Sequence, residues 1–187
     1  MVELLICIAI ITLVAAILLP VLLNAREKSH ASDCLSNLHQ IGLAERIYLN
    51  DYDGVYPTNL MLIASFGPHS GLKGCPSAGS KERTSPTLPG YAFNGQLHGV
   101  FQAGLMPMHE SEIYAPSFTV SVGEVTVPVA INGWGDPLVR GRRHHNGAHF
   151  LFCDGHLKWH LPDTVLAVTD VGDGTRPTFN PFFSPNE

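Results

Sequence analysis

Apolar residues fill almost every position from 1 to 23, and the chain turns abruptly polar from Asn24 onward. The polar or irregular exceptions within this stretch are Glu3, Thr12 and Pro20. About twenty apolar residues, each rising ~1.5 Å along a helix, cover the ~30 Å hydrocarbon core of a bilayer. The stretch is too long for the apolar region of a secretory signal, and no basic residue precedes Arg26. We therefore expect a retained membrane-spanning helix.

A second periodic segment follows between positions 24 and 50. Apolar residues recur there at spacings of three and four, at Ala31, Cys34, Leu35, Leu38, Ile41 and Tyr48. This period predicts an amphipathic helix that continues the first segment and buries one face. Pro20 removes a backbone hydrogen bond and is expected to kink or loosen the long helix. The turn-forming residues from Asn50 to Gly54, with Pro57 behind them, predict its end.

The remaining chain has the composition of a loop-rich β domain. Segments 91–101 and 118–131 are β-type, and the expected strand core is Val120, Val122, Val125, Val127 and Val129. Segment 67–89, rich in Gly, Ser and Pro, predicts an irregular loop. Segments 148–153 and 156–161 predict a hairpin, because Asp154-Gly155 between them is typical of a two-residue type I′ turn.

The hairpin strands are expected to offer one face each to a core. The alternating apolar residues are Phe150 and Phe152 in the first strand and Leu157, Trp159 and Leu161 in the second.

These patterns predict an α+β fold, in which a long N-terminal helix packs on a C-terminal antiparallel sheet with long loops. Its expected parts are the hydrophobic segment 1–23, the amphipathic segment 24–50, and a domain over 51–187 with an extended C-terminal tail. Charged residues make up only 14% of the chain, while 18 Gly and 14 Pro favour many turns. A net charge of -5 gives no reason to expect nucleic acid as the main partner.

The four cysteines are Cys7, Cys34, Cys75 and Cys153, and their spacings match neither haem attachment nor a structural zinc site. In an oxidising compartment Cys34 and Cys75 could pair and fasten the first loop to the helix, although spacing leaves paired and unpaired states open. We interpret Cys7 as a small apolar residue and Cys153 as a buried free thiol.

Candidate chemistry is concentrated near the predicted hairpin. His144, His145, His149, Asp154 and His156 lie within thirteen positions, so a divalent-metal site at His144, His149 and Asp154 is one hypothesis. The alternative is a structural role, since turn geometry alone explains Asp154. Oxygen ligands for calcium are also present, without EF-hand spacing, at Asp51, Asp53, Asp136, Asp170 and Asp173.

The chain also contains one cluster of basic residues and lacks the common catalytic motifs. Arg140, Arg142 and Arg143, with His144 and His145, form a positive run. This run is either a solvated loop or a contact for an acidic face of a neighbouring subunit or for a surface polymer. Nucleophile, phosphate-loop and HExxH motifs are absent from the sequence, so we do not expect an enzyme.

Several motifs together resemble the type IV pilins and type II secretion pseudopilins. At the start of the chain these are the apolar run 2–11 with Glu3, then Pro20 and Ala25-Arg26-Glu27-Lys28. Farther on, the bacterial prepilin-type H-X9-DG subgroup is resembled by Cys34-Leu35-Ser36-Asn37-Leu38, by Asp51-Tyr52-Asp53-Gly54-Val55-Tyr56-Pro57, and by His144 followed after nine residues by Asp154-Gly155.

The resemblance implies a structural subunit of a pilus-like or pseudopilus filament, with segment 1–23 in the filament core. Glu3 would offset the amino-terminal charge of an adjacent subunit, and Pro20 would mark where the helix extends during assembly. His144, Asp154 and Gly155 are the subgroup's signature, without established chemistry. A basic leader and four mature residues normally precede the glutamate, where this sequence has Met1 and Val2.

The implied partners are identical subunits, membrane lipid before assembly, an inner-membrane assembly platform and a prepilin peptidase. The monomer would sit in the cytoplasmic membrane with its domain outside, and the filament would be periplasmic or extracellular. Related pseudopilins use calcium to order a loop, so a divalent cation is a further expectation. The alternatives are a minor pseudopilin of a type II secretion system and a single-span anchored domain that binds a metal or ligand.

Overall fold

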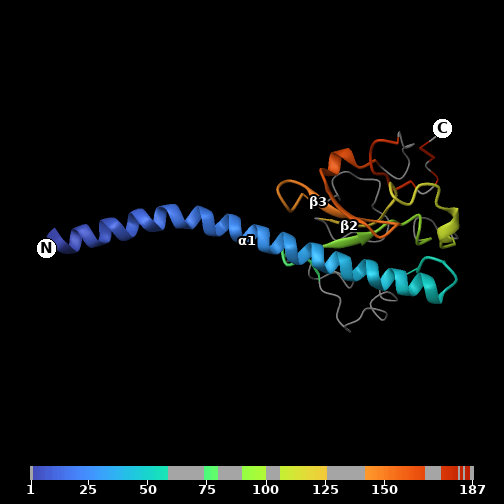
Figure 1. Ribbon diagram of the computed structural model, residues 1–187, viewed down its shortest axis with the longest axis horizontal. Coiled ribbons are helices and arrows are strands. Elements are labelled where there is room, and N and C mark those ends of the chain that lie inside the picture. The colour runs from blue at the N-terminus through green and yellow to red at the C-terminus, as the bar shows by residue number, and fades with distance from the viewer. Residues whose placement is uncertain are drawn as a thin grey trace.

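The computed structural model describes residues 2–58, 74–79, 90–99, 106–125, 142–166, 174–180, 182 and 184–185. One long helix packs on a four-stranded antiparallel sheet, which is an α+β arrangement (Figure 1). The N-terminal half of the helix projects away from the domain, whereas its C-terminal half lies along it. The predicted fold class is confirmed.

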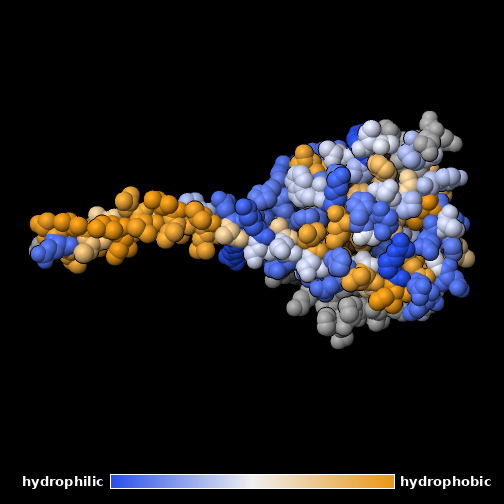
Figure 2. All heavy atoms as spheres, viewed as in Figure 1, coloured by the Kyte–Doolittle hydropathy of each residue, from blue (hydrophilic) through white to orange (hydrophobic). Residues whose placement is uncertain are grey.

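Helix α1 runs without interruption over Val2–Asp51, which is 50 residues. At 1.5 Å per residue it is about 75 Å long. The helix continues through Pro20, and its axis curves gently in the apolar half (Figure 1). The expected loosening at Pro20 is therefore not a break. Side chains of this half are exposed and, apart from Glu3 and Thr12, mostly apolar, and apolar residues dominate the face shown in Figure 2. The segment is long and apolar enough to span a membrane.

The C-terminus of α1 is closed by the residues that sequence indicated. Asp53 and Gly54 have positive φ angles of 52° and 78°. The reversed backbone lets the amide of Gly54 donate to the carbonyl of Leu49 at 2.7 Å, which satisfies an acceptor at the helix end. The chain then leaves the helix axis toward the sheet.

The sheet has the order β1-β2-β3-β4, with each neighbouring pair antiparallel. Its strands are β1 (Tyr91–Phe93), β2 (Val120–Glu124), β3 (Ala148–Phe152) and β4 (Leu157–His160). Two 3-10 helices, η1 (Glu110–Glu112) and η3 (Pro162–Thr164), lie between or after them. Strand β1 is shorter than the composition suggested, since residues 95–99 form turns. Val127, Val129 and most of segment 67–89 lie outside the described residues.

A bulge in β2 decides which side chains face the helix. Val120 pairs with Phe152 and Val122 pairs with Leu151, so Ser121 is an extra residue in its strand. Ser121 hydrogen-bonds a side chain of α1, and Val122 packs against the same helix, whereas Val120 belongs to the cluster on the other face. In a regular strand adjacent side chains point to opposite faces, so only one of Ser121 and Val122 would have faced the helix.

Both faces of the sheet are covered by apolar side chains. Against α1 pack Cys34, Leu38, Ile41, Cys75, Ala78, Tyr91, Val122 and Leu151. The opposite face is covered by C-terminal residues and contains Ala92, Val120, Val125, Ala148, Phe150, Phe152, Val165 and Phe179. A third cluster closes the end of α1 with Leu49, Tyr56, Leu97, Met108, Ile113 and Cys153. Cys153 is a buried free thiol, as expected.

The predicted hairpin is present, but its turn is of another kind. Phe152 donates to the carbonyl of His156 at 3.0 Å and Gly155 donates to that of Phe152 at 2.8 Å, so the loop contains three residues. Gly155 has a φ of 93° and Asp154 does not have a positive φ, which fits a type I turn followed by a glycine bulge. The type I′ prediction for Asp154-Gly155 is wrong.

The core assignment for the hairpin is only partly right. Phe150 and Phe152 are buried, and so is Leu151 between them. The reason is that α1 covers one face of β3, while the C-terminal residues Val165 and Phe179 cover the other. Trp159 and Leu161 remain 42% and 41% exposed, since β4 is the edge strand.

Candidate functional site

His144 is placed by a tight turn immediately before β3. His145 and Asn146 have φ angles of 52° and 64°, and His144 and Gly147 exchange backbone hydrogen bonds of 3.0 and 3.1 Å. Two consecutive positive φ values are typical of a type I′ turn. That turn type therefore occurs here rather than at Asp154-Gly155.

The ring of Trp159 closes this turn from outside. Its Nε1 donates to the carbonyl of His144 at 2.9 Å. A Cβ atom on Gly147 would lie 2.2 Å from the indole ring, so only glycine fits beneath it. The contact holds the backbone of His144 while its side chain turns into the protein.

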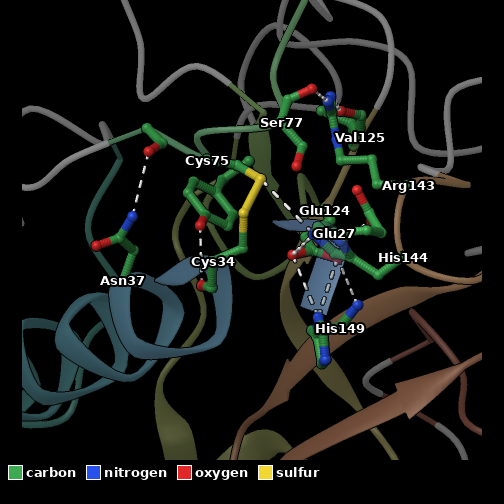
Figure 3. Close-up of a disulfide and its surroundings, with 12 residues drawn as sticks. Glu27, Cys34, Asn37, Cys75, Ser77, Glu124, Val125, Arg143, His144 and His149 are labelled. Carbon is green, nitrogen blue, oxygen red and sulfur yellow. Dashed lines mark hydrogen bonds and ion pairs between the residues drawn. A yellow bond between two sulfur atoms is a disulfide. The ribbon is translucent and has the colours of Figure 1, made fainter. Parts of the chain in front are cut away.

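The imidazole of His144 lies between two carboxylates from different elements (Figure 3). Its Nδ1 is 2.9 Å from Oε1 of Glu27 on α1, and its Nε2 is 3.4 Å from Oε1 of Glu124 on β2. The side chain is only 1% exposed. Burial alone would lower the pKa of His144, but the hydrogen bonds and charges of Glu124 and Glu27 outweigh it and raise that pKa.

Glu124 is completely buried, and its carboxylate is hydrogen-bonded by two histidines. The backbone amide of His149 donates to its Oε2 at 2.7 Å, and Nδ1 of His149 lies 3.3 Å away. Burial would raise the pKa of Glu124, yet the hydrogen bonds from His144 and His149 lower it overall. The lowered pKa favours the ionised form of Glu124 in the interior, where the hydrogen bonds from His144 and His149 stabilise its charge.

A disulfide joins Cys34 on α1 to Cys75 at this corner, with a Cα–Cα distance of 4.8 Å (Figure 3). This is the pairing proposed from sequence. The hydroxyl of Tyr91 donates to the carbonyl of Cys34 at 2.9 Å, and Asn37 donates to Gly74 at 3.2 Å. Sγ of Cys75 lies 3.8 Å from Nε2 of His144, so the disulfide and the charged cluster are in direct contact.

Arg143 points inward beside the disulfide. It donates to the carbonyl of Ser77 at 2.9 Å and to that of Val125. Arg142 points outward and forms an exposed ion pair with Asp163. The basic run thus divides between a structural and a solvent-exposed role, and Arg140 lies outside the described residues. The interpretation of the run as one solvated loop is wrong for Arg143.

A second buried carboxylate lies farther along α1. The hydroxyl of Ser121, placed by the β2 bulge, donates to Glu45 at 2.7 Å. Burial raises the pKa of Glu45 to about 7, while the hydrogen bond from Ser121 and the charge of Arg46 oppose the rise. The helix therefore makes a part-buried polar contact through Glu27 with the turn before β3, and a buried one through Glu45 with β2.

The metal ligands suggested from sequence do not come together. His144 and His149 meet through Glu124, with ring centroids 5.4 Å apart. Asp154 lies past the other end of β3, roughly 15 Å from His149 at about 3.3 Å per residue. It instead contacts His156, whose Nδ1 is 2.6 Å from its Oδ1. The proposed set of His144, His149 and Asp154 is wrong for geometric reasons.

The calcium candidates receive no support from the described part of the chain. Among those residues, the group of three or more potential metal ligands is Cys34, Cys75, Glu124 and His144, without Asp51 or Asp53. Asp136, Asp170 and Asp173 lie outside the described residues. Of the predicted assembly residues, Glu3 lies in the first turn of α1, and Pro20 in its exposed half.

Sequence reasoning missed the carboxylates. Glu45 follows Ala44 on a face otherwise made of apolar residues, and Glu124 sits in a strand rich in valine, so each was visible as a charge in an apolar pattern. Glu27 gave no such signal within its polar run. Its contact with His144 spans 117 positions and appears only in three dimensions. Comparison with protein-family models, with curated proteins and with solved structures finds no match for this chain.

Proposed function

We propose that this chain is a structural subunit of an extracellular pilus-like or pseudopilus filament that assembles through α1. The observation that carries the proposal is the projecting half of the helix, whose exposed side chains are apolar except near Glu3 and Thr12 and are not buried by the domain. A helix of this kind requires lipid or other helices around it. The membrane supplies that surrounding for the monomer, and neighbouring subunits supply it in the filament.

Glu3 is the polar group at the start of this surface. Its neighbours Leu4 and Leu5 are 68% and 62% exposed, so a packed bundle of helices would bury the carboxylate among them. A buried carboxylate needs a cationic partner. In our proposal this partner is the terminal amine of an adjacent subunit, and the pair sets the axial register between subunits.

The amphipathic half of α1 also presents apolar side chains outward. Leu35, Leu43 and Ile47 are 36%, 45% and 43% exposed, although the opposite side of the helix is buried in the domain. These residues extend the apolar surface beyond the projecting half. They give a neighbouring subunit a second contact, close to the domain.

The disulfide supports the proposed location of the domain. Such bonds persist outside the cytoplasm, so a monomer anchored by α1 would carry its domain on the outer side of the cytoplasmic membrane. Identical subunits, an assembly platform and a prepilin peptidase are the proposed partners. The second candidate, a single-span anchored binding domain, is favoured by the buried cluster of His144 and Glu124, and a minor pseudopilin would share the same architecture.

Electron cryo-microscopy of filaments sheared from expressing cells tests the proposal. We expect a helical map with α1 in the core and with Glu3 facing a neighbour's amino terminus. Glu3→Ala should insert into membranes normally but abolish filaments, whereas Thr12→Ala in the same apolar half should assemble. Filaments without this chain, while the chain remains in detergent-extracted membrane, would favour the minor pseudopilin or the anchored domain.

A further inference from the structure

Four potential metal ligands converge at the disulfide corner from four separate segments. They are Sγ of Cys34 and of Cys75, a carboxylate oxygen of Glu124 and a ring nitrogen of His144, all within 4.8 Å of one another. Their residues are 0%, 3%, 0% and 1% exposed. Ligand atoms around a tetrahedral zinc ion are about 3.3–3.8 Å apart, given bonds of 2.0–2.3 Å. Small side-chain rotations therefore suffice to enclose an ion.

The sulfur atoms cannot serve as zinc ligands while they are bonded to each other. We propose that reduction of the Cys34–Cys75 bond converts this corner into a zinc site made of both thiolates, Glu124 and His144. A dithiol reductant supplies two electrons and two protons: the S–S bond breaks, each cysteine becomes a thiol, and the dithiol closes to its own disulfide. Zinc binding then releases both thiol protons to solvent.

The orientation of His144 suits this role. Its Nε2 lies on the side of Cys75 and Glu124, at 3.8 and 3.4 Å, whereas its Nδ1 faces Glu27 at 2.9 Å. When Nε2 binds the ion, Nδ1–H donates to the Glu27 carboxylate. Zinc-bound histidines commonly make this outer hydrogen bond, which fixes the ring and strengthens the ligand. Glu27 is thus a positioning residue rather than a ligand.

The charges of the corner also fit. Two thiolates and Glu124 carry three negative charges, of which a zinc ion neutralises two. The guanidinium of Arg143 is held beside the site by the carbonyls of Ser77 and Val125. It compensates the remaining charge, so the ion, its four ligands and Arg143 are neutral together, while the carboxylate of Glu27 lies outside this set on a side chain that is 37% exposed.

The two states close the same corner by different means. In an oxidising compartment the covalent bond holds α1 to the 74–79 segment, and where thiols are kept reduced the ion holds both to β2 and to the turn before β3. The cysteine spacing did not indicate zinc because each ligand comes from a different part of the chain. This site is independent of filament formation.

Cobalt(II), whose spectrum reports its ligands, is the probe. The full chain in detergent is reduced with a dithiol, freed of it under anaerobic conditions and titrated with cobalt. We expect one equivalent to bind with the ligand-field bands of a tetrahedral site and the charge-transfer intensity of two thiolates. Zinc should displace it, because zinc binds such sites more tightly. The oxidised chain should show neither signal.

Variants separate the proposed ligands from other groups. Glu124→Gln and His144→Gln should each weaken cobalt binding at least about 10-fold, and Glu27→Gln about 10-fold or more through the outer hydrogen bond. Cys153→Ser removes a buried thiol outside the site, and His156→Gln an exposed histidine; both should leave the spectrum unchanged. Near-UV circular dichroism of each oxidised variant checks its fold before reduction.

Three results would overturn the proposal. The first is a reduced wild-type chain that binds no cobalt or binds it without tetrahedral bands. The second is a charge-transfer intensity for one thiolate or none, which requires no variant. The third is equal binding by the oxidised chain, or unchanged binding by folded Glu124→Gln and His144→Gln.

Discussion

At the scale of single residues, Glu45 shows how a charge can be tolerated between helix and sheet. The carboxyl is 4% exposed, and its hydrogen-bond donor is the hydroxyl of Ser121. One neutral donor does not replace the hydration of an ionised carboxylate, so burial raises the pKa of Glu45 to about 7. The protonated form is the one that suits the folded state.

This property predicts a pH-dependent stability. Because the folded-state pKa of Glu45 is raised, its contribution is fully present below about pH 4.5 and is lost as pH rises through about 7. Glu45→Gln keeps the shape without the charge, so above pH 7 it should unfold with a free energy larger than wild type by roughly 3 kcal/mol. Chemical unfolding of both chains in detergent across this pH range measures the difference.

The control for Glu45 is an exposed carboxylate on the same helix. Asp33→Asn should follow the wild-type pH profile, because Asp33 remains in water. Parallel profiles for Glu45→Gln and wild type would show that the carboxyl of Glu45 does not titrate near neutrality.

His144 should be the most sensitive histidine of the domain to substitution. His144→Ala leaves the buried Glu124 without one of its two imidazole partners and removes the link to Glu27. Loss of one member of a buried ion pair costs about 3–5 kcal/mol of unfolding free energy. Urea unfolding of the oxidised chain measures this loss. His156→Ala, at an exposed turn, should cost far less. Similar costs for both variants would show that the contacts of His144 with Glu27 and Glu124 do not stabilise the domain.

At the scale of elements, the geometry of the β3–β4 turn explains the Asp154-Gly155 pair. Asp154 accepts a hydrogen bond from the amide of His156 at 3.1 Å, and Gly155 adopts a φ of 93°. A side chain at Gly155 would meet no atom within 4 Å. The glycine is therefore required for its backbone conformation and not for space.

The positive φ of Gly155 predicts how substitutions at this position change stability. Gly155→Ala should destabilise the domain by about 1–2 kcal/mol, because a Cβ atom disfavours positive φ. Gly155→Asn should cost less, since asparagine tolerates this region better. Thermal unfolding compares the two variants. A cost for asparagine that equals or exceeds that of alanine would indicate a side-chain clash, contrary to the open space observed.

Local patterns predicted the elements better than their connections. The apolar period placed α1 and its end, and alternation placed β3 and β4, because these signals lie within a few residues of each other. The turn at Asp154-Gly155 was misassigned because the same residue pair suits both a type I′ turn and a glycine bulge. The β2 bulge at Ser121 had no signal, since it depends on the register with β3.

At the scale of the whole molecule, the two halves of α1 have different surroundings. Residues of the projecting half are exposed, for example Leu22 at 65%, whereas Cys34, Leu38 and Ile41 are fully buried. The sequence shows the same contrast between the apolar segment 1–23 and the amphipathic segment 24–50, so the long helix could be predicted from it. The cluster of Glu27, Glu124 and His144 did not, because it joins residues that only the packed sheet and helix bring together.

The independence of the halves can be tested by truncation. A chain that begins at Asn24 should be soluble without detergent and should keep the near-UV circular dichroism of the full domain, because the removed residues contact none of its core. Analytical ultracentrifugation and circular dichroism check both points. Aggregation of the oxidised truncated chain, or loss of its near-UV signal, would show that the apolar half supports the domain.

The disulfide has a mechanical consequence. A tensile load applied along the projecting half of α1 reaches Cys34 before the buried contacts of Leu38 and Ile41, and the covalent bond transfers it directly to Cys75. The intervening chain, across a sequence separation of 41, is then bypassed by the force. While the bond is intact, the residues between Cys34 and Cys75 lie outside the covalent path of such a load, so in the proposed filament each subunit would resist stretching through sulfur as well as through its hydrophobic core.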